Sequence, residues 1–413
     1  MSTDSYSYSE SDSCVESIDN EPLSQYKLGG YYPVSIGELF NNRYRIIKKL
    51  GWGVFSTVWL VYDYQEVEVF KVLKIQRADE TATEAANDEI DIVKKVQPEY
   101  GCHLIEDFTQ ESIFGVHLVL VFHLCGENLL SSIRIFRYNG LPPKVVKKIA
   151  KQLLLSLIHI HETVKVVHTD IKPENILIAT PSKEIKHIVS KYKPPPITEP
   201  IRLIDRNEFT MNKAQKKRYK KLKKVHHGGE VGDDISSEDD DEYLDRLSKI
   251  KMVDFGNAQW VDNTCDMVIQ TRPYRAPEVI IAETYDETAD LWSIACTIYE
   301  LLTGDHIFNA KSGKGYNIED DHLALICGTL DSNMLCYKDF KYYQMFYNDK
   351  SESKYIKNIR HKSIKNILKQ NYSFSEMEAV DWERFFKYMF VVDYTKRPSA
   401  GTVFKIFNHW LSN

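Results

Sequence analysis

The stretch "ADLWSIACTIYELLTG", residues 289–304, constrains the fold more than any other in this chain of 413 residues. It is apolar on nearly every helical face, whereas a surface helix carries one polar face. Such a helix must be enclosed on all sides, and a chain of this length can build the large domain that encloses it. Gly304 predicts the end of the helix, because glycine readily adopts the left-handed conformation of a C′ residue.

Two kinds of hydrophobic pattern divide the rest of the chain. The stretches 43–63 and 112–124 alternate β-branched and aromatic residues and predict strands, and residues 82–96 predict a helix between them. After "NGLPP" a long helix is predicted, with Val146, Ile149, Leu153, Leu157 and Ile160 on its apolar face. We therefore expect an α+β fold, strand-rich at 30–122 and mostly helical at 123–180 and 249–413.

The composition changes sharply between residues 181 and 248. This segment contains a proline cluster, the basic run "KAQKKRYKKLKK" and the acidic run "SSEDDDE". Such blocks bury too little apolar surface to offset the entropy of ordering, so we predict a disordered spacer inserted into the helical part. Residues 1–25, rich in Ser, Asp, Glu and Tyr, are predicted to be disordered for the same reason.

The net charge of −6 indicates no global attraction to nucleic acid or anionic lipid, and we expect no direct nucleic-acid binding. Apolar runs are shorter than the roughly 18–20 residues of a membrane span, and the acidic N-terminus is unlike a signal peptide. The seven cysteines are scattered, without a C-x-x-C pair or a Cys/His cluster, which favours a reducing compartment. We expect a monomeric cytoplasmic protein without membrane attachment, and the nucleus stays open as a second location.

The stretch "HTDIKPEN", residues 168–175, follows an apolar strand pattern and places Asp170, Lys172 and Asn175 on a polar turn. Loops held by a rigid element commonly carry catalytic groups, although turn formation alone would also explain Asp, Pro and Asn. Asp254, in "VDFG", likewise follows a strand pattern. Asn175 and Asp254 together offer two oxygen ligands suited to Mg²⁺, which prefers few protein groups beside substrate phosphates.

A glycine-containing bend joins two strand patterns, and its candidate phosphate-binding residues are Leu50, Gly51, Trp52, Gly53, Val54, Phe55, Ser56, Thr57 and Val58. Small residues let backbone N–H groups approach phosphates, although a tight turn explains the glycines equally well. No helix follows, which excludes a Rossmann fingerprint and a P-loop. Lys74, in the next strand pattern, and Glu89, in the predicted helix, suit an ion pair that holds the lysine against phosphates. Lys71 is the alternative lysine.

These motifs, in this order and followed by "APE" at 276–278, resemble the protein kinases. The resemblance covers the chain from Arg43 to its end, apart from the spacer. It implies a bilobal protein kinase fold, with a strand-rich N-lobe and a helical C-lobe, that binds ATP and Mg²⁺.

The resemblance also implies a role for each candidate residue. Asp170 would accept or orient the substrate hydroxyl proton, Lys172 would steady the γ-phosphate, and Asn175 and Asp254 would hold the metal. The segment 50–58, Lys74 and Glu89 would bind ATP. Glu278 is expected to pair with Arg397 and Asp290 to anchor the buried helix, while Lys172 and Thr271 favour transfer to Ser or Thr over Tyr.

Finer features are similar to the SR-protein kinases, which phosphorylate serines in Arg/Ser-rich segments of splicing factors. The stretches that carry this similarity are "LGWGVFSTVWL", "HTDIKPEN", "DFGNAQW", "QTRPYRAPEV" and "LLTGDHIF", together with the spacer before D-F-G. Two alternatives stay open. One is a LAMMER-type dual-specificity kinase, although its E-H-L-A-M-M-E-R stretch corresponds to "DDHLALICG" here. The other is a catalytically weak scaffold pseudokinase, although every catalytic position is filled.

The same similarity predicts an acidic surface that docks basic substrates. Asp305 and Asp321 match two docking acids of the family, and the neighbouring Glu319 and Asp320 are expected to extend the surface. Gly328 stands where the family has Glu. This departure weakens the expectation of a full docking groove and of long processive phosphorylation.

Overall fold

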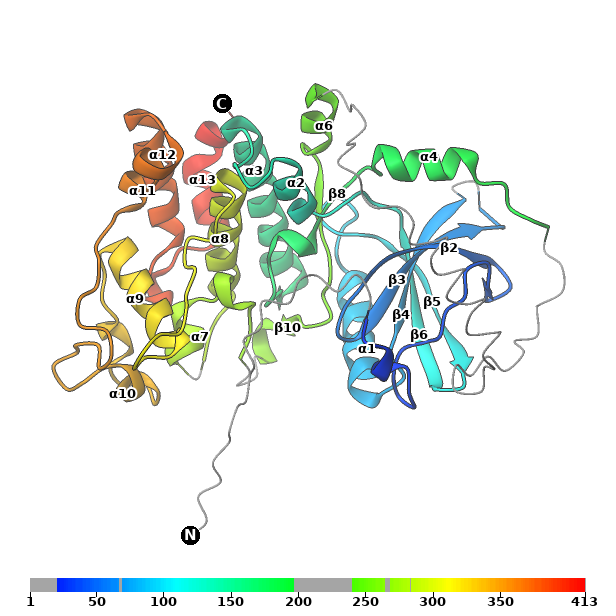
Figure 1. Cartoon of the computed structure of the whole chain (residues 1–413), viewed down its shortest axis with the longest axis horizontal. Coiled ribbons are helices and arrows are strands. Elements are labelled where there is room, and N and C mark those ends of the chain that lie inside the picture. Colours follow the sequence, from blue (N-terminus) through cyan, green and yellow to red (C-terminus); the bar gives the residue numbers. More distant parts are fainter. Residues whose placement is uncertain (1–20, 67–68, 197–239, 264–267, 283, 413) are drawn as a thin grey trace, which may run out of the picture. The chain divides into compact units, whose positions relative to one another are not determined.

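The computed structural model describes residues 21–66, 69–196, 240–263, 268–282 and 284–412, and it divides into two compact units (Figure 1). The first unit takes in the chain up to Glu84 together with Asp107–Leu120. The second takes in Ala85–Glu106 and Val121–Asn413. The first unit is strand-rich and the second mostly helical, as the hydrophobic patterns predict.

A six-stranded sheet forms most of the first unit, with the strand order β1-β2-β3-β4-β6-β5. The strands are β1 (Leu39–Phe40), β2 (Tyr44–Trp52), β3 (Ser56–Asp63), β4 (Phe70–Gln76), β5 (Leu104–Ser112) and β6 (Gly115–His123). β1 to β4 pair antiparallel in sequence order. Apolar side chains are buried on both sides of the sheet, since Leu60 lies opposite Val72 and Leu73 lies opposite Trp59, and both leucines are fully buried.

Helices form most of the second unit. They are α1 (Glu80–Val93, which begins in the first unit), α2 (Leu129–Ile135), α3 (Pro143–Ile158), α4 (Lys183–Lys191), α6 (Asp240–Arg246), α7 (Pro277–Ile281), α8 (Thr288–Thr303), α9 (Ile318–Leu330), α10 (Tyr343–Phe346), α11 (Ile364–Tyr372), α12 (Glu376–Met389) and α13 (Ala400–Leu411). Two short antiparallel ladders accompany them. β7 (Val166–Val167) pairs with β10 (Gln259–Trp260), and β8 (Ile176–Ile178) pairs with β9 (Ile250–Met252).

Helix α8 forms the core of the second unit. All sixteen of its residues are buried, as its apolar sequence predicts. It packs against α3 and α12, and the predicted apolar face of α3 is fully buried. The Trp292 ring of α8 stacks on Phe308 and meets Phe390 edge-on. The enclosed helix is therefore a rigid base for the segments that lie on it.

The prediction of a disordered spacer over residues 181–248 is wrong at both ends of that segment. α4 begins at Lys183 with Ser182 as its N-cap, so ordered structure continues past residue 181. At the other end, the Tyr243 hydroxyl of α6 donates to Ser132, and Arg246 pairs with Glu127 at 2.8 Å. These apolar and paired side chains hold α6 on the second unit despite its acidic sequence. The central part of the predicted spacer, 197–239, lies outside the described residues.

The prediction that residues 1–25 are disordered is also wrong for its last residues. A 3₁₀ turn spans Leu23–Gln25, and the buried Glu21 carboxylate accepts hydrogen bonds from Tyr26 and Lys49. Residues 1–20 lie outside the described residues.

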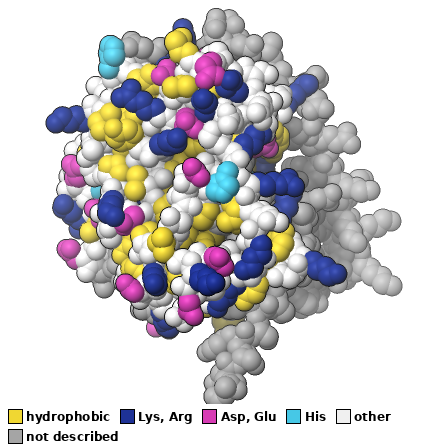
Figure 2. Space-filling model, turned by 90° about the vertical axis from the view of Figure 1, so that its left-hand side faces the viewer, with side chains coloured by type: hydrophobic (Ala, Val, Ile, Leu, Met, Phe, Trp, Pro, Cys, Tyr) yellow, Lys and Arg dark blue, Asp and Glu magenta, His cyan; other side chains and the backbone are white. Residues whose placement is uncertain are grey.

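Figure 2 shows the face of the second unit on the side of α9–α12, where basic and acidic side chains alternate around hydrophobic ones. This face therefore presents no large field of a single sign, in keeping with the modest net charge of −6. None of the helices within the described residues has both the length and the apolar character needed to cross a bilayer.

Gly304→Ala is expected to lower the free energy of unfolding by about 2 kcal/mol or more. Gly304 ends α8 at a φ of +82°, and an added Cβ would lie 2.0 Å from the carbonyl oxygen of Tyr138. Gly315→Ala is the matched control, because Gly315 has a φ of +89° but open space around it. Urea unfolding of both variants separates the close approach from the backbone conformation. Equal losses of stability would show that the contact with Tyr138 contributes nothing.

Candidate active site

The stretch 168–170 is held by one buried carboxylate. Asp290 of α8 is fully buried and accepts hydrogen bonds from the backbone N–H groups of His168 and Thr169, at 2.6 and 2.9 Å. His161, in the π-turn after α3, contacts the same carboxylate at 2.9 Å. Thr169 has a φ of +70°, a conformation that non-glycine residues rarely adopt. Asp290 therefore offsets the strain that sets the direction of the next residue, Asp170.

Asp170 lies at the centre of a compact polar cluster. Its Oδ1 accepts from the Thr271 hydroxyl at 2.7 Å, and its Oδ2 accepts from Lys172 Nζ at 2.7 Å. Asn175 Nδ2 donates to Asp170 Oδ2 at 3.1 Å and to its backbone oxygen at 2.9 Å. Lys172 also donates to Thr271 at 2.9 Å. The structure thus brings Asp170, Lys172 and Asn175 together, and adds Thr271, which is 101 residues away from Asp170 in sequence.

Asp254 follows strand β9, two residues after its end at Met252, and lies beside this cluster. The N–H of the preceding Val253 donates to the Asn175 backbone oxygen at 3.0 Å, and the Val253 oxygen contacts His168 Nε2 at 3.0 Å. Since a carbonyl only accepts, Nε2 carries the proton, and Nδ1 accepts from the Asp170 N–H at 3.3 Å. Asp254 has a φ of +67°, which marks a sharp change of chain direction.

Glu89 also reaches the D-F-G stretch, although it was predicted only as a partner of Lys74. It is buried on α1, and a Cβ placed on Gly256 would lie 3.7 Å from Glu89 Oε2 and 3.8 Å from Asp254 Oδ1. A side chain at position 256 would therefore meet both carboxylates. A Cβ alone would fit there in ordinary van der Waals contact, so the distances show only that Gly256 lies close to both acids.

The predicted phosphate-binding bend joins β2 and β3 in the first unit. The Gly53 N–H donates to the Ser56 oxygen at 2.8 Å, and a Cβ added at Gly51 or Gly53 would meet no atom within 4 Å. Ser56 and Thr57 are buried, and Phe55 is half-buried. The remaining apolar residues of the bend stand out from the unit, with exposed fractions of 39% for Leu50, 38% for Trp52 and 67% for Val54.

Tyr31 fastens this bend, and no motif in the sequence points to it. Its hydroxyl contacts the backbone oxygens of Gly53 at 2.7 Å and Val54 at 3.1 Å. The Arg77 guanidinium lies 5.5 Å from the centre of the Tyr31 ring. The backbone N–H of Arg77 donates to the backbone oxygen of Phe55 at 2.8 Å. Both residues therefore hold the bend in place from within the first unit.

The strand register distinguishes the two candidate lysines. Lys74 lies directly opposite Val58 of β3, and both are half-buried on the same side of the sheet as Gly51. Lys71 lies opposite Val61, on the other side, where its exposed fraction is 3%. The sheet thus puts Lys74 on the side of the glycine bend. Lys74 belongs to the first unit and Glu89 to the second, and their ion pair stays a prediction.

The segment after the D-F-G stretch is fastened to α8 by Gln270, a residue that the sequence does not single out. Gln270 has a φ of +67°, and its Nε2 donates to the Ala289 oxygen at 2.8 Å and to Ser293 at 2.9 Å. Its Oε1 accepts from the Ala276 N–H at 2.8 Å. Since Thr271 is the next residue, this amide fixes the hydroxyl that meets Asp170.

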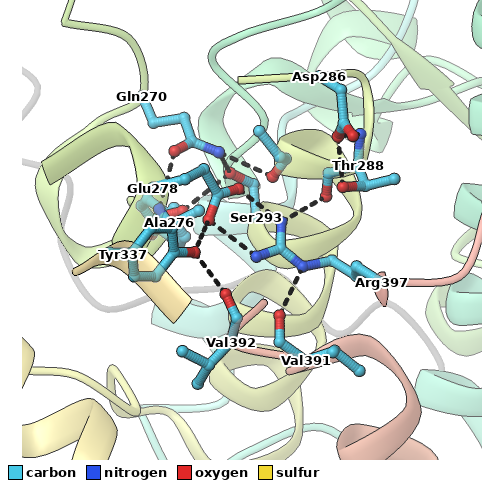
Figure 3. A network of polar contacts seen from close by, with 12 residues as sticks. Gln270, Ala276, Glu278, Asp286, Thr288, Ser293, Tyr337, Val391, Val392 and Arg397 are labelled. Carbon is cyan, nitrogen blue, oxygen red and sulfur yellow. Dashed lines mark hydrogen bonds and ion pairs between the residues drawn. The ribbon is translucent and has the colours of Figure 1, made fainter. Parts of the chain in front are cut away.

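Glu278 and Arg397 form the predicted ion pair (Figure 3). The pair is bidentate, at 2.6 and 2.8 Å, and neither side chain is exposed. Arg397 also donates to the oxygens of Thr288 and Val391, at 3.1 and 2.9 Å. Additional hydrogen bonds of this kind help to offset the desolvation of a buried ion pair.

Fold and site are matched by a family model. The protein kinase domain aligns with residues 44–189 and 239–410, and the gap between them falls within the predicted spacer. Together with the Asp170 cluster, this match defines the class: the chain is a protein kinase, which uses ATP as its phosphoryl donor.

Comparison with individual relatives identifies the family of protein kinases more narrowly. The "Serine/threonine-protein kinase SRPK" of Physarum polycephalum is 33% identical over 92% of this chain and 89% of its own length. "Protein kinase dsk1" of Schizosaccharomyces pombe is 32% identical over 94% of this chain and 85% of its own length. The human "SRSF protein kinase 3" is 29% identical over 93% of this chain and 89% of its own length. The chain therefore belongs to the SR-protein kinases, a family of serine/threonine protein kinases, and the resemblance seen in the sequence is confirmed.

Arg397→Met is expected to lower the free energy of unfolding by about 3–5 kcal/mol, because it leaves the Glu278 carboxylate buried without a cation. Adding Glu278→Gln to this variant is expected to recover part of the loss, since the uncompensated charge is then gone. Chemical unfolding measures both changes.

Lys396→Ala is the control, because it removes the neighbouring but exposed pair with Asp393. This variant is expected to unfold at the wild-type midpoint. The interpretation would be wrong if Arg397→Met were as stable as Lys396→Ala.

Proposed function

We propose that this kinase transfers the γ-phosphoryl group of ATP to serines in Arg/Ser-rich segments of proteins such as splicing factors. The Asp170 cluster is the observation that supports the transfer to Ser or Thr. Its carboxylate is oriented by Thr271, Lys172 and Asn175 within 2.7–3.1 Å, so that it can accept the proton of an incoming hydroxyl. Phosphoryl transfer depends mostly on such positioning and on charge neutralisation.

Lys172 supplies the positive charge in this proposal. Its ammonium has three N–H groups, and two of them donate to Asp170 and Thr271. This places the charge directly beside the base, where the γ-phosphoryl oxygens pass during transfer. The Thr271 hydroxyl donates to the base and accepts from the lysine, so it holds the two groups together.

Asn175 and Asp254 fit a Mg²⁺ ion. The Asn175 Nδ2 donates to Asp170, so its Oδ1 is the atom left to ligate a cation, and Asp254 adds carboxylate oxygens from the adjacent segment. Such hard oxygen donors, few in number, are what Mg²⁺ takes from a protein beside phosphate oxygens. When bound, the ion would neutralise charge on the phosphates.

The glycine bend and Lys74 would bind the nucleotide. The space above Gly51 and Gly53 lets their backbone approach phosphates, and the exposed Leu50 and Val54 offer apolar contacts. Lys74 lies on the same side of the sheet as Val58 and would hold the α- and β-phosphates, with Glu89 as its ion-pair partner.

Asp170→Ala is expected to lower kcat by about 10³-fold or more, because the proton acceptor and its orienting contacts are lost together. ATP should still bind, since Asp254 and the glycine bend are unchanged. Phosphate incorporation into an Arg/Ser peptide and binding of a fluorescent ATP analogue measure the two effects. Asp349→Asn, an exposed acid, is the control and should keep wild-type turnover. A scaffold pseudokinase would instead show no difference between wild type and Asp170→Ala.

The acidic docking surface is smaller than the sequence predicts. Glu319 is engaged in ion pairs with Arg272 and Arg275, at 3.4 and 3.3 Å, and Asp320 is a buried residue of the capping box of α9. Asp305 is exposed, with one oxygen accepting from Tyr372, and Asp321 is half-buried, with one oxygen accepting from the Lys311 N–H. Asp305 and Asp321 are therefore the acids that we propose to meet substrate arginines.

Position 328 cannot provide a third acid. A Cβ on Gly328 would lie 2.3 Å from the backbone oxygen of Arg360, and the Gly328 oxygen accepts from the Lys362 N–H at 3.1 Å. The segment after α10 thus packs on the helix where the family carries Glu. We propose that docking is correspondingly weaker and that phosphorylation of long Arg/Ser segments is less processive.

The double variant Asp305→Asn, Asp321→Asn is expected to raise KM for an Arg/Ser peptide several-fold while leaving kcat nearly unchanged. Exposed attraction is screened beyond about 8–10 Å at physiological ionic strength, so the difference from wild type should shrink as salt rises. Peptide kinetics at low and high salt measure this, with Asp349→Asn as the control. A wild-type preference for acidic or proline-directed peptides would contradict the substrate class, whereas the Asp170 experiment would still test catalysis.

A further inference from the structure

Two cysteines that are far apart in sequence meet in the second unit. The Sγ atoms of Cys102 and Cys125 lie 3.2 Å apart, although 23 positions separate the residues. The segments around them run side by side, since the His123 N–H donates to the His103 oxygen at 3.3 Å and the two imidazole rings are 5.5 Å apart. A disulfide has an S–S length of about 2.05 Å, so the sulfurs need to approach by about 1 Å.

The surroundings favour reaction at Cys125. Donation from the Cys102 thiol lowers the pKa of Cys125, since it stabilises the thiolate, and the positive charge of Lys251 lowers it further, while burial opposes both. The same thiol–thiol contact, together with burial, raises the pKa of Cys102. Cys102 is half-buried and the exposed fraction of Cys125 is 9%, so the proposed reaction requires a small oxidant to reach Cys125 beside Cys102. A nucleophilic thiolate with a second thiol beside it is the arrangement of reversible thiol oxidation.

The other described cysteines lack this arrangement. Burial raises the pKa of the Cys296 and Cys327 thiols. Burial and the Asp393 charge raise the pKa of Cys336 to about 11. Each of these thiols is therefore mostly protonated near neutral pH, and thiols are poor nucleophiles in that form.

We propose that Cys102 and Cys125 form a redox modification site, in which a hydroperoxide converts the two thiols into a reversible disulfide. The Cys125 thiolate attacks one oxygen of hydrogen peroxide, the O–O bond breaks, and a sulfenic acid forms; the hydroxide that leaves takes up the proton that the Cys125 thiol released on ionisation and becomes the first water. The Cys102 sulfur then attacks the sulfenic sulfur, the S–O bond breaks, and the hydroxyl leaves with the Cys102 proton as a second water. Two thiols lose two electrons in total, and the peroxide gains them.

The site lies where a cross-link would act on the kinase. The adjacent Gly101 bridges to Met252 of β9, two residues before Asp254, and the Gly126 N–H donates to the Ile178 oxygen of β8 at 2.8 Å. The chain also passes between the two units after Glu106 and after Leu120, a few residues from each cysteine. A disulfide would join both passing segments at their ends in the second unit. Since opening and closing of such segments often limits product release, we expect oxidation to lower kcat.

Peptide mapping of the full-length protein tests the site. The reduced protein is treated with hydrogen peroxide, remaining thiols are blocked with N-ethylmaleimide, and the digest is analysed by mass spectrometry without reductant. We expect a peptide that links residues 102 and 125 and that dithiothreitol releases. Cys336→Ser, the control, should form the same link.

The two single variants separate the roles of the thiols. Cys102→Ser should form no link and should accumulate sulfenic or sulfinic acid on Cys125, because the second thiol is missing. Cys125→Ser should leave Cys102 largely unmodified. In wild type, kcat should fall several-fold on oxidation and recover with dithiothreitol, and both variants should keep their kcat under the dose that forms the link.

The site would be overturned if the mapped link joined other cysteines, such as Cys14 or Cys265, or if both thiols were oxidised to sulfinic acid without a link. Formation of the 102–125 link with an unchanged kcat would overturn its effect on the kinase. Melting temperatures near that of wild type would show that the two serine variants are folded.

Discussion

The buried carboxylate of Asp290 is the contact on which the active site depends. From the first turn of a fully enclosed helix, it accepts two backbone N–H groups and contacts a histidine, all within 2.6–2.9 Å. Charge-assisted bonds of this kind are strong where water is excluded, and they hold Thr169 in a conformation that costs about 1–3 kcal/mol. The direction of Asp170 follows from this turn. The apolar helix α8 thus has a functional role, because its burial fixes the position of the acid that anchors the site.

A second use of α8 explains how distant segments come together. Gln270 fastens one end of the segment 270–278 to Ala289 and Ser293, and Arg397 fastens the other end through Glu278. These two anchors bring Thr271 to Asp170. Arginine, which would receive a phosphate in kinases with H-R-D, is replaced by Thr169, whose hydroxyl instead donates to the Asn257 oxygen at 2.8 Å. At position 169 a neutral hydrogen bond therefore stands where those kinases have a charged group.

The sequence predicted the fold class, the buried helix and the Glu278–Arg397 pair, because periodicity and motif order carry these features directly. It could not distinguish solvated from structural acids. Asp320, which was expected on the docking surface, is buried and caps α9, whereas Glu319 is partly exposed and pairs with arginines. The acidic sequence around α6 concealed Tyr243 and Leu247, two buried residues that hold the helix. Some contacts join residues far apart in sequence, and a local sequence pattern cannot predict them. They are the contacts of Tyr31, of Gln270 and of the pair Cys102–Cys125.

The ladder of β8 and β9 makes the long insertion the tip of a hairpin. Ile178 lies opposite Ile250, and the Ala179 N–H donates to the Lys249 oxygen at 2.8 Å, so both ends of the insertion are fixed side by side. The entropy of closing such a loop grows only with the logarithm of its length, and each doubling costs about 0.6 kcal/mol. Residues can therefore be gained or lost at this tip with little effect on Asn175 and Asp254, which lie at the opposite end of the ladder. The insertion is thus the place where a kinase of this architecture can change in length over evolution while its catalytic geometry is kept.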